Sequence, residues 1–165
     1  MRDCRVQDWS LDPDAKNRYQ LRALSNIKFV VVHHSGVDAD NSAEEIRRYH
    51  RDSLGWPGIG YSFVIRKDGE IEHSGDIATV RYHVAARNLE CLGICLVGDF
   101  TSHHPTEEQL GAAHNLVSVL MPLLDPSESG RIKVKGHGEL ALPGHGTSCP
   151  GWTWPEWRNA FWPWI

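Results

Sequence analysis

A β-rich and largely apolar run from Ile27 to Val32 passes directly into His33-His34-Ser35-Gly36, and this junction constrains the fold most strongly. A run of this length and residue type is typical of a strand that is buried on both faces. Gly36 then indicates a turn. The sequence therefore predicts a buried strand whose carboxyl end carries two imidazole side chains.

The remaining elements follow from capping boxes, a hairpin turn and apolar periodicity. Ser42 and Thr106 each begin a capping box, and Lys67-Asp68-Gly69 marks a hairpin turn. The expected elements are helices at about 43–51 and 106–124, a hairpin of 61–66 with 70–73, strands at 92–97 and 132–135, and a final helix with Pro155 in its first turn. Because strands and helices alternate, we predict a layered α/β domain over residues 27–165, preceded by an irregular lead-in over residues 1–26.

The composition argues against several classes of protein. The 165 residues are 41% hydrophobic and 23% charged, as in an ordinary globular domain. A net charge of −4 argues against nucleic acid as a partner, because phosphate binding needs clustered Lys and Arg. No apolar run of about 18 residues occurs, so no membrane span is expected. The polar N-terminal segment lacks the pattern of a secretory signal, so we expect synthesis in the cytoplasm without a signal peptide.

The cysteines and tryptophans outside the motifs below are assigned to packing. Cys91 and Cys95 fall in one predicted strand, where four residues span roughly 13 Å, which is too far for a disulfide. We expect both thiols to be buried as small hydrophobic groups. The tryptophans that crowd the C-terminus predict a helix packed on the core, with a sugar-stacking surface as the alternative.

Three residues at the ends of predicted elements are candidates for metal binding. His33 ends the buried strand, His137 follows the strand at 132–135, and Cys149 lies in a turn-rich loop. Imidazole and thiolate are good zinc ligands, and three protein ligands leave the open position of a catalytic zinc. Because the three residues are far apart in sequence, spacing alone leaves open that they are hydrogen-bonded structural residues.

Short motifs that include these residues follow one another along nearly the whole chain. They are Val31-Val32-His33-His34-Ser35, Gly55-Trp56, Ile59-Gly60-Tyr61-Ser62-Phe63-Val64-Ile65, Lys67-Asp68-Gly69, His83 with Asn88, Leu92-Gly93-Ile94-Cys95-Leu96-Val97-Gly98, Gly136-His137 and Thr147-Ser148-Cys149-Pro150-Gly151. In this order they resemble the zinc amidase family that includes peptidoglycan recognition proteins, phage lysozyme-type amidases and bacterial muramoyl-alanine amidases. The resemblance extends from about Ile27 to Gly151.

The resemblance implies a single domain with a central mixed β-sheet flanked by helices, as in peptidoglycan recognition proteins. It implies that His33, His137 and Cys149 hold Zn²⁺. Tyr61 matches a tyrosine that takes part in catalysis in the family, and Thr147 matches a residue that polarises the substrate carbonyl. Family members with Ser in place of the cysteine tend to bind peptidoglycan without cutting it, so Cys149 favours an active enzyme.

The resemblance also implies a substrate cleft lined by His83 and Asn88. His34 points to the face opposite His33 if the strand persists, and it makes either a strand-end hydrogen bond or a substrate contact. Glu139 either orients His137 or is a solvated loop residue.

Two features depart from the family pattern. The loop from His137 to Cys149 is longer than is usual and contains His145, which is a rival to His137 as the ligand. Cys95 stands where the recycling amidases have Glu, so the chain sides with the phage-type and recognition-protein-type members.

The expected function is that of a zinc-dependent N-acetylmuramoyl-L-alanine amidase, which hydrolyses the amide between N-acetylmuramic acid and L-alanine in peptidoglycan. We expect a monomeric phage-type endolysin or bacterial lytic enzyme that acts at the bacterial cell wall. A non-catalytic peptidoglycan receptor and a regulatory binding protein on the same fold are alternatives. A third alternative is a domain with a structural zinc, which would unfold when the metal is chelated.

Overall fold

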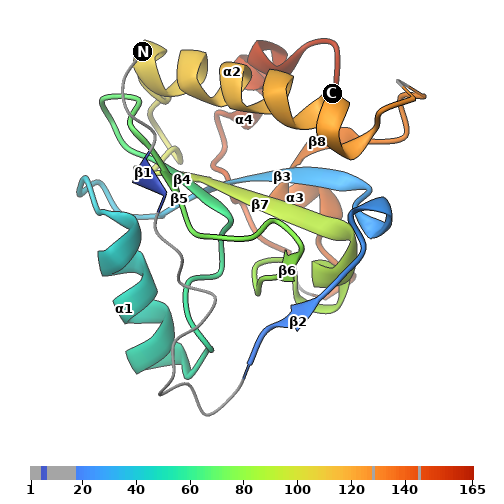
Figure 1. Ribbon diagram of the computed structural model, residues 1–165. Coiled ribbons are helices and arrows are strands. Elements are labelled where there is room, and N and C mark those ends of the chain that lie inside the picture. The colour runs from blue at the N-terminus through green and yellow to red at the C-terminus, as the bar shows by residue number, and fades with distance from the viewer. Residues whose placement is uncertain (1–4, 7–17, 128, 145) are drawn as a thin grey trace.

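The computed structural model describes residues 5–6, 18–127, 129–144 and 146–165 (Figure 1). Within these residues the central sheet has six strands, which are β1 (Arg5–Val6), β3 (Phe29–His34), β4 (Phe63–Ile65), β5 (Ile71–His73), β7 (Cys91–Leu96) and β8 (Lys133–Gly136). A separate ribbon pairs β2 (Gln20–Leu21) with β6 (Thr79–Val80). The helices are α1 (Ala43–Leu54), α2 (Glu107–Leu124), α3 (His137–Leu140) and α4 (Trp154–Trp157), and 3₁₀ helices occupy Leu24–Asn26, Ala85–Glu90 and Arg158–Phe161.

The central sheet is mixed, with strand order β1-β5-β4-β7-β3-β8. β3 lies between β7 and β8 and is parallel to both. β4 is parallel to β7 and antiparallel to β5, with which it forms the predicted hairpin. The prediction of an α/β domain with a central mixed sheet flanked by helices is confirmed (Figure 1).

The two capping boxes start the long helices where the sequence predicts. The side chain of Ser42 accepts a hydrogen bond from Glu45 N–H, and Thr106 does the same for Gln109. α1 runs one turn farther than expected and ends at Gly55, whose φ of +68° favours glycine. β3 continues past Val32 to His34, because β7 pairs with it as far as Leu96.

The expectation of an irregular lead-in over residues 1–26 is wrong in part. β1 pairs in parallel with β5 at one edge of the central sheet. β2 pairs with β6, and Tyr19 donates a hydrogen bond to the carbonyl of Ile59. Short strands of two residues give too little sequence pattern to be recognised, so these pairings depend on tertiary contacts.

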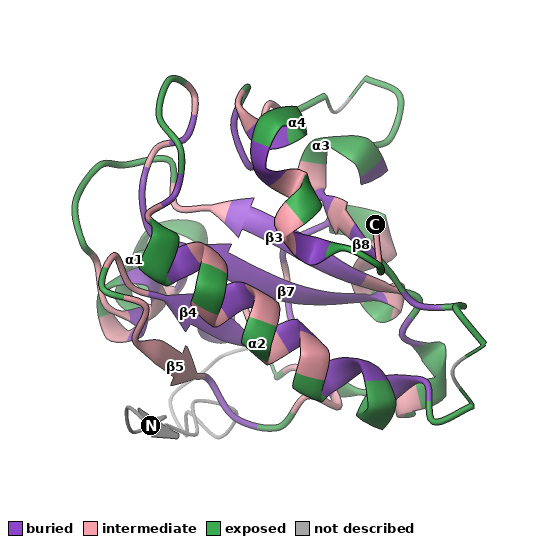
Figure 2. Cartoon of the chain, turned by 90° about the horizontal axis from the view of Figure 1, so that it is seen from above, coloured by how far each residue is buried: buried purple, intermediate pink, exposed green. Residues whose placement is uncertain are grey.

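Alternate residues of β3 face two different layers. Val30 and Val32 join the main apolar core, which includes residues of α2 and the C-terminal aromatic residues Trp154, Trp157 and Phe161. On the other face, α1 contributes Ala43 and Ile46 to a smaller apolar cluster that includes Cys95. Figure 2 shows α2 lying across the buried strands, and Figure 1 shows α1 beyond the opposite face.

Packing accounts for part of the tryptophan cluster. Trp154 and Trp157 are buried in the main core, as the packing interpretation predicts, whereas Trp152 and Trp162 are exposed. Cys91 and Cys95 are buried free thiols. Within the described part of the chain, no helix has both the length and the apolar character needed to cross a membrane.

Candidate metal centre and cleft

Two parallel neighbours in the sheet bring His33 and His137 together. β3 and β8 pair with Val32 opposite Gly136, so the next residue on each strand emerges at the same edge of the sheet. After Gly136 the chain turns into α3, and His137 is the first residue of that helix. The centroids of the His33 and His137 rings lie 4.6 Å apart.

Cys149 reaches the same place from the loop that follows α3. Its carbonyl accepts a hydrogen bond of 2.7 Å from Gly138 N–H, and a side chain at Gly138 would overlap the Thr147 carbonyl. The sulfur of Cys149 lies 3.6 Å from Nδ1 of His33. One ligand atom from each of His33, His137 and Cys149 lies within 4.8 Å of the other two.

This donor set fits zinc. Zinc binds imidazole nitrogen at about 2.0–2.1 Å and thiolate sulfur at about 2.3 Å, so tetrahedral ligand atoms are about 3.4–3.7 Å apart. The distance between Cys149 Sγ and His33 Nδ1 already falls in that range. Three protein ligands would leave a fourth position open to water or substrate.

Burial shifts the pKa values of the histidine and cysteine ligands in opposite directions. It lowers the pKa of His33 well below its usual value, with the neighbouring His83 and His137 adding to the effect. Both His33 and His137 therefore keep the neutral form that a metal requires. Burial raises the pKa of Cys149 to about 12, and a hydrogen bond from the backbone of His34 only partly opposes this rise. A metal would have to displace the thiol proton.

Tyr61 packs against this group. Its ring centroid lies 5.0 Å from that of His33 and 5.5 Å from that of His50. Burial raises the pKa of Tyr61 well above its usual value, and the Cys95 and Cys149 thiols add to the rise. The hydroxyl therefore keeps its proton and can donate a hydrogen bond.

His50 is a site residue that the sequence analysis missed. It lies on the buried face of α1 with Ala43 and Ile46, and its Nδ1 accepts a hydrogen bond of 3.0 Å from Gly60 N–H, directly before Tyr61. Its ring also packs on Trp56, with centroids 4.6 Å apart. A histidine in the apolar stripe of an amphipathic helix was the available signal.

Thr147 lies two residues before Cys149 and is exposed. Its hydroxyl oxygen accepts a hydrogen bond of 3.1 Å from Cys149 N–H. This bond uses the oxygen as an acceptor and leaves the hydroxyl proton available to an incoming group.

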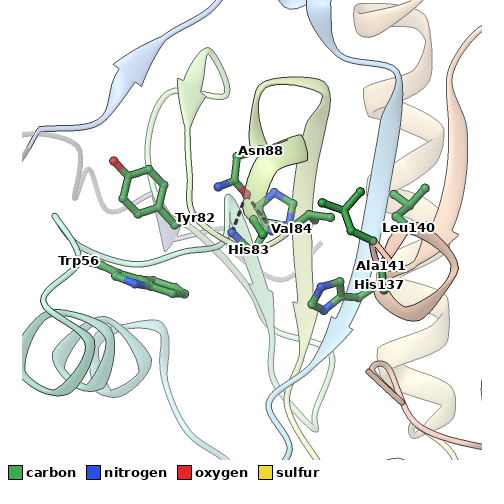
Figure 3. Close-up of a pocket in the computed structure, with 10 residues that line it drawn as sticks. Trp56, Tyr82, His83, Val84, Asn88, His137, Leu140 and Ala141 are labelled. Atoms are coloured by element: carbon green, nitrogen blue, oxygen red, sulfur yellow. Dashed lines mark hydrogen bonds between the residues drawn. The ribbon is translucent and has the colours of Figure 1, made fainter. Parts of the chain in front are cut away.

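Several hollows border this group in the described part of the chain, including one of about 160 Å³ that is lined by Thr147 and Cys149. One, of about 450 Å³, opens beside His137 and is shown in Figure 3. It is lined by Trp56, Tyr82, His83, Val84, Ala85, Asn88, His137, Leu140, Ala141 and Leu142. Another, of about 430 Å³, is lined by α1 residues that include His50, together with Ser35, Val37, Asn41 and Tyr61. The candidate metal centre therefore borders a largely apolar hollow at His137, and the neighbouring Tyr61 borders a more polar one.

The structure does not bring His34 into this group. Its ring lies on the α2 face of β3, where Nδ1 accepts a hydrogen bond of 3.2 Å from Phe100 N–H and is 3.7 Å from the Asp99 carboxylate. This placement agrees with the interpretation of a strand-end hydrogen bond, and a substrate contact of His34 stays a prediction.

His83 and Asn88 line the hollow next to His137, and the Asn88 carboxamide oxygen and both ring nitrogens of His83 have partners within the protein (Figure 3). The carboxamide oxygen of Asn88 accepts hydrogen bonds from the backbone N–H groups of His83 and Val84, at 2.9 and 2.8 Å. Nδ1 of His83 is 2.9 Å from Nε2 of His33. Both residues thus shape the wall of the cleft.

Glu139 is exposed, but it lies in α3 and its carboxylate has partners in the protein. One carboxylate oxygen accepts hydrogen bonds from Gly136 N–H at 2.7 Å and from the Trp154 indole at 2.9 Å. The other lies 3.5 Å from the Lys135 ammonium group. Glu139 therefore caps α3 and fixes the backbone from which His137 projects. His145, the predicted rival ligand, lies outside the described residues.

Comparisons with known proteins agree with this architecture. The profile of the Amidase_2 family, described as N-acetylmuramoyl-L-alanine amidase, matches residues 23–152. The chain is 31% identical over 133 residues to peptidoglycan-recognition protein LB of Drosophila melanogaster, covering 74% of this chain and 54% of that protein. It thus spans about half the length of that relative.

A phage protein and a solved complex are also similar. The endolysin of Klebsiella phage KP32 is 31% identical over 133 residues, which cover 78% of this chain and 83% of the endolysin. Among solved structures, tracheal cytotoxin bound to the ectodomain complex of peptidoglycan recognition proteins LCa and LCx matches with a TM-score of 0.76 and 27% identity, over 91% of this chain and 90% of the matched chain. The chain belongs to the N-acetylmuramoyl-L-alanine amidase family, Amidase_2.

Proposed function

We propose that the protein is a zinc-dependent N-acetylmuramoyl-L-alanine amidase, which hydrolyses the amide between the lactyl group of N-acetylmuramic acid and L-alanine in peptidoglycan. The convergence of His33, His137 and Cys149 within 4.8 Å, beside a hollow that His137 lines, carries this proposal. When bound there, zinc would act as a Lewis acid toward the substrate carbonyl and activate water. Membership of the amidase family supports the same bond specificity.

The neighbouring side chains suit amide hydrolysis. Water adds its hydroxyl to the lactyl carbonyl carbon, and the departing nitrogen of L-alanine gains a proton. Tyr61 keeps its proton and would donate a hydrogen bond to the oxyanion that develops on the carbonyl oxygen. The Thr147 hydroxyl, which is oriented by Cys149 N–H, would donate from the loop side.

The two hollows suit a substrate with two arms. The scissile amide joins a sugar to a peptide, so both parts must extend away from the reacting carbon. The hollow beside His137 and the hollow beside Tyr61 have no lining residue in common. Each arm of the substrate would occupy one hollow, which would hold the amide over the ligands.

We assign the activity to residues 27–165 and propose that the protein acts as a monomer on bacterial cell walls. The endolysin relative supports a lytic enzyme of phage or bacterial origin. A peptidoglycan receptor without hydrolytic activity is the second candidate, and the similarity to the recognition proteins bound to tracheal cytotoxin favours it. Both functions require a peptidoglycan fragment in the cleft, so only measured hydrolysis separates them.

The test is mass spectrometry of products from purified peptidoglycan, with zinc content measured on the same sample. We expect release of peptides with a free L-alanine amino group, with about one zinc per chain. Activity should disappear on chelation and return with zinc, while the circular dichroism spectrum stays that of a folded protein. Binding to peptidoglycan without any peptide release would instead establish the receptor.

A further inference from the structure

Two histidines form a hydrogen-bonded chain behind the candidate metal centre. Nε2 of His33 is 2.9 Å from Nδ1 of His83, and Nε2 of His83 is 3.3 Å from the carbonyl oxygen of Cys91. Both rings are buried. We propose that His83 is a positioning residue, which sets the tautomer of His33 so that Nδ1 of His33 is free to bind the metal.

The direction of the chain follows from its fixed end. A carbonyl oxygen only accepts hydrogen bonds, so Nε2 of His83 must carry a proton. In the neutral His83 ring, Nδ1 is then an acceptor, and Nε2 of His33 must be the donor. The lone pair of His33 is therefore on Nδ1, which is the nitrogen 3.6 Å from the Cys149 sulfur. The hydrogen bond to the Cys91 carbonyl thus fixes the tautomer of His83, and through it the nitrogen of His33 that is free to bind the metal.

Two residues hold the His83 ring in place. The Asn88 carboxamide oxygen binds the backbone N–H groups of His83 and Val84, which fixes the turn that carries the ring. Gly93 in β7 leaves room for it, since a Cβ atom there would lie only 2.9 Å from His83 Nδ1. The ring therefore packs directly against the backbone of the central strand. Because both nitrogens of His83 are engaged, it offers the cleft only its carbon edge.

This inference rests on the proposed zinc site, and it predicts an effect of His83 on metal affinity without direct contact. Partners that orient a metal-binding histidine typically change affinity by about 10- to 100-fold. We expect His83→Leu, which removes the acceptor, to weaken zinc binding by about that factor. His83→Asn should restore much of the affinity, because its carboxamide oxygen can take the place of Nδ1.

The experiment has two readouts. Long-range proton–nitrogen NMR of the metal-free wild type identifies the protonated nitrogen of His33, and competition with a chromophoric chelator gives the zinc affinity of each variant. We expect a proton on Nε2 of His33 in the wild type and in His83→Asn, and a mixture of tautomers in His83→Leu. His114→Leu is the matched control, because this α2 histidine binds the Ala160 carbonyl at 2.7 Å away from the centre.

A proton on Nδ1 of His33 in the wild type would overturn the inference without any variant. So would a folded His83→Leu protein with wild-type zinc affinity. If the wild type binds no zinc at all, both the proposed function and the role assigned to His83 are wrong. If zinc binds and peptides are released but His33 carries its proton on Nδ1, only the inference about His83 fails.

Discussion

His33 and His34 are neighbours in β3, yet they lie in opposite environments. His34 faces the α2 layer, where it accepts a backbone hydrogen bond at the rim of a large apolar core. His33 faces the α1 layer, where it meets His83, His137, Tyr61 and Cys149. The α2 face of the sheet is built mainly from apolar side chains, whereas the α1 face combines smaller apolar clusters with imidazole, phenol and thiol groups.

The difference suggests that the α2 face stabilises the fold and that the α1 face carries the activity. Burying each large apolar side chain contributes about 1.5–3 kcal/mol, so the α2 face stabilises the fold. Buried polar groups cost free energy unless they are paired, and the α1 face holds several of them. Substitutions on the α1 face should therefore reduce activity more than stability, and those on the α2 face should do the reverse.

The largest expected effect on the α1 face comes from Cys149→Ser. Because the thiolate is a ligand in our proposal, peptide release from peptidoglycan should fall below detection, while the melting temperature and co-sedimentation with peptidoglycan persist. Ser148→Ala is the matched control, since it alters the same loop without removing a ligand. Peptide release by Cys149→Ser at the wild-type rate would show that the ligand assignment is wrong.

The largest expected effect on the α2 face comes from Phe161→Ala. Phe161 is fully buried among Trp154 and Trp157, and removing such a side chain costs about 3–5 kcal/mol of unfolding free energy. Urea denaturation measures the loss, and zinc affinity of the folded protein should be unchanged. Val119→Ala on the exposed side of α2 should change stability by less than about 0.5 kcal/mol. Equal losses in the two variants would contradict this account of the core.

Tyr61→Phe tests the α1 face without touching a ligand. Loss of one oxyanion donor typically lowers kcat by about 10²–10³-fold. Zinc affinity and stability should change little, because the ring and its packing on His33 are retained. Steady-state kinetics on a soluble muropeptide gives the comparison. A kcat within a factor of about three of the wild type would remove Tyr61 from the mechanism.

His50 gives the α1 face a pH-dependent stability. Burial lowers its pKa from 6.5 to about 4, so the unfolded chain binds more protons between these values. The neutral ring therefore contributes stability above pH 6.5, and about 3 kcal/mol of it should be lost as the pH falls from about 6.5 to about 4. Urea midpoints across this range test the effect. His50→Gln should flatten the difference, and parallel curves for the two proteins would contradict it.

The smallest effect is expected for His34→Leu. The substitution removes the acceptor of Phe100 N–H, so it should cost about 1 kcal/mol of stability. Zinc affinity should stay at the wild-type value, because the ring lies on the far side of β3. Isothermal titration with zinc checks this. A tenfold loss of affinity would mean that the two faces are coupled.

Features that depend on local sequence signals could be predicted on both faces of the sheet. The β3 run, both capping boxes and the hairpin are local signals, and each predicted element is present with its ends shifted by a few residues. Strand alternation separates His33 from His34 correctly. The family motifs bring in His137 and Cys149. The parallel pairing of β3 with β8 places His137 beside His33, and the loop after α3 places Cys149 there.

Residues whose roles depend on contacts across the fold could not be predicted in the same way. His50 meets Gly60 only when α1 folds back on the loop before β4. Asn88 and His83 line the hollow as predicted, but the bonds from the Asn88 oxygen to the backbone and from His83 to His33 could not be read from a motif. Glu139 caps α3 by accepting from Gly136 N–H, and it also accepts from the indole of Trp154, fifteen residues away, which no short motif encodes.

The most direct test of the central claim is an anomalous difference map at the zinc absorption edge, from crystals grown with one equivalent of zinc. We predict a single strong peak within bonding distance of Nδ1 of His33, a ring nitrogen of His137 and Sγ of Cys149. A peak that replaces His137 with His145 would revise one ligand. A zinc ion bound elsewhere, with these three residues left unbound, would contradict the account.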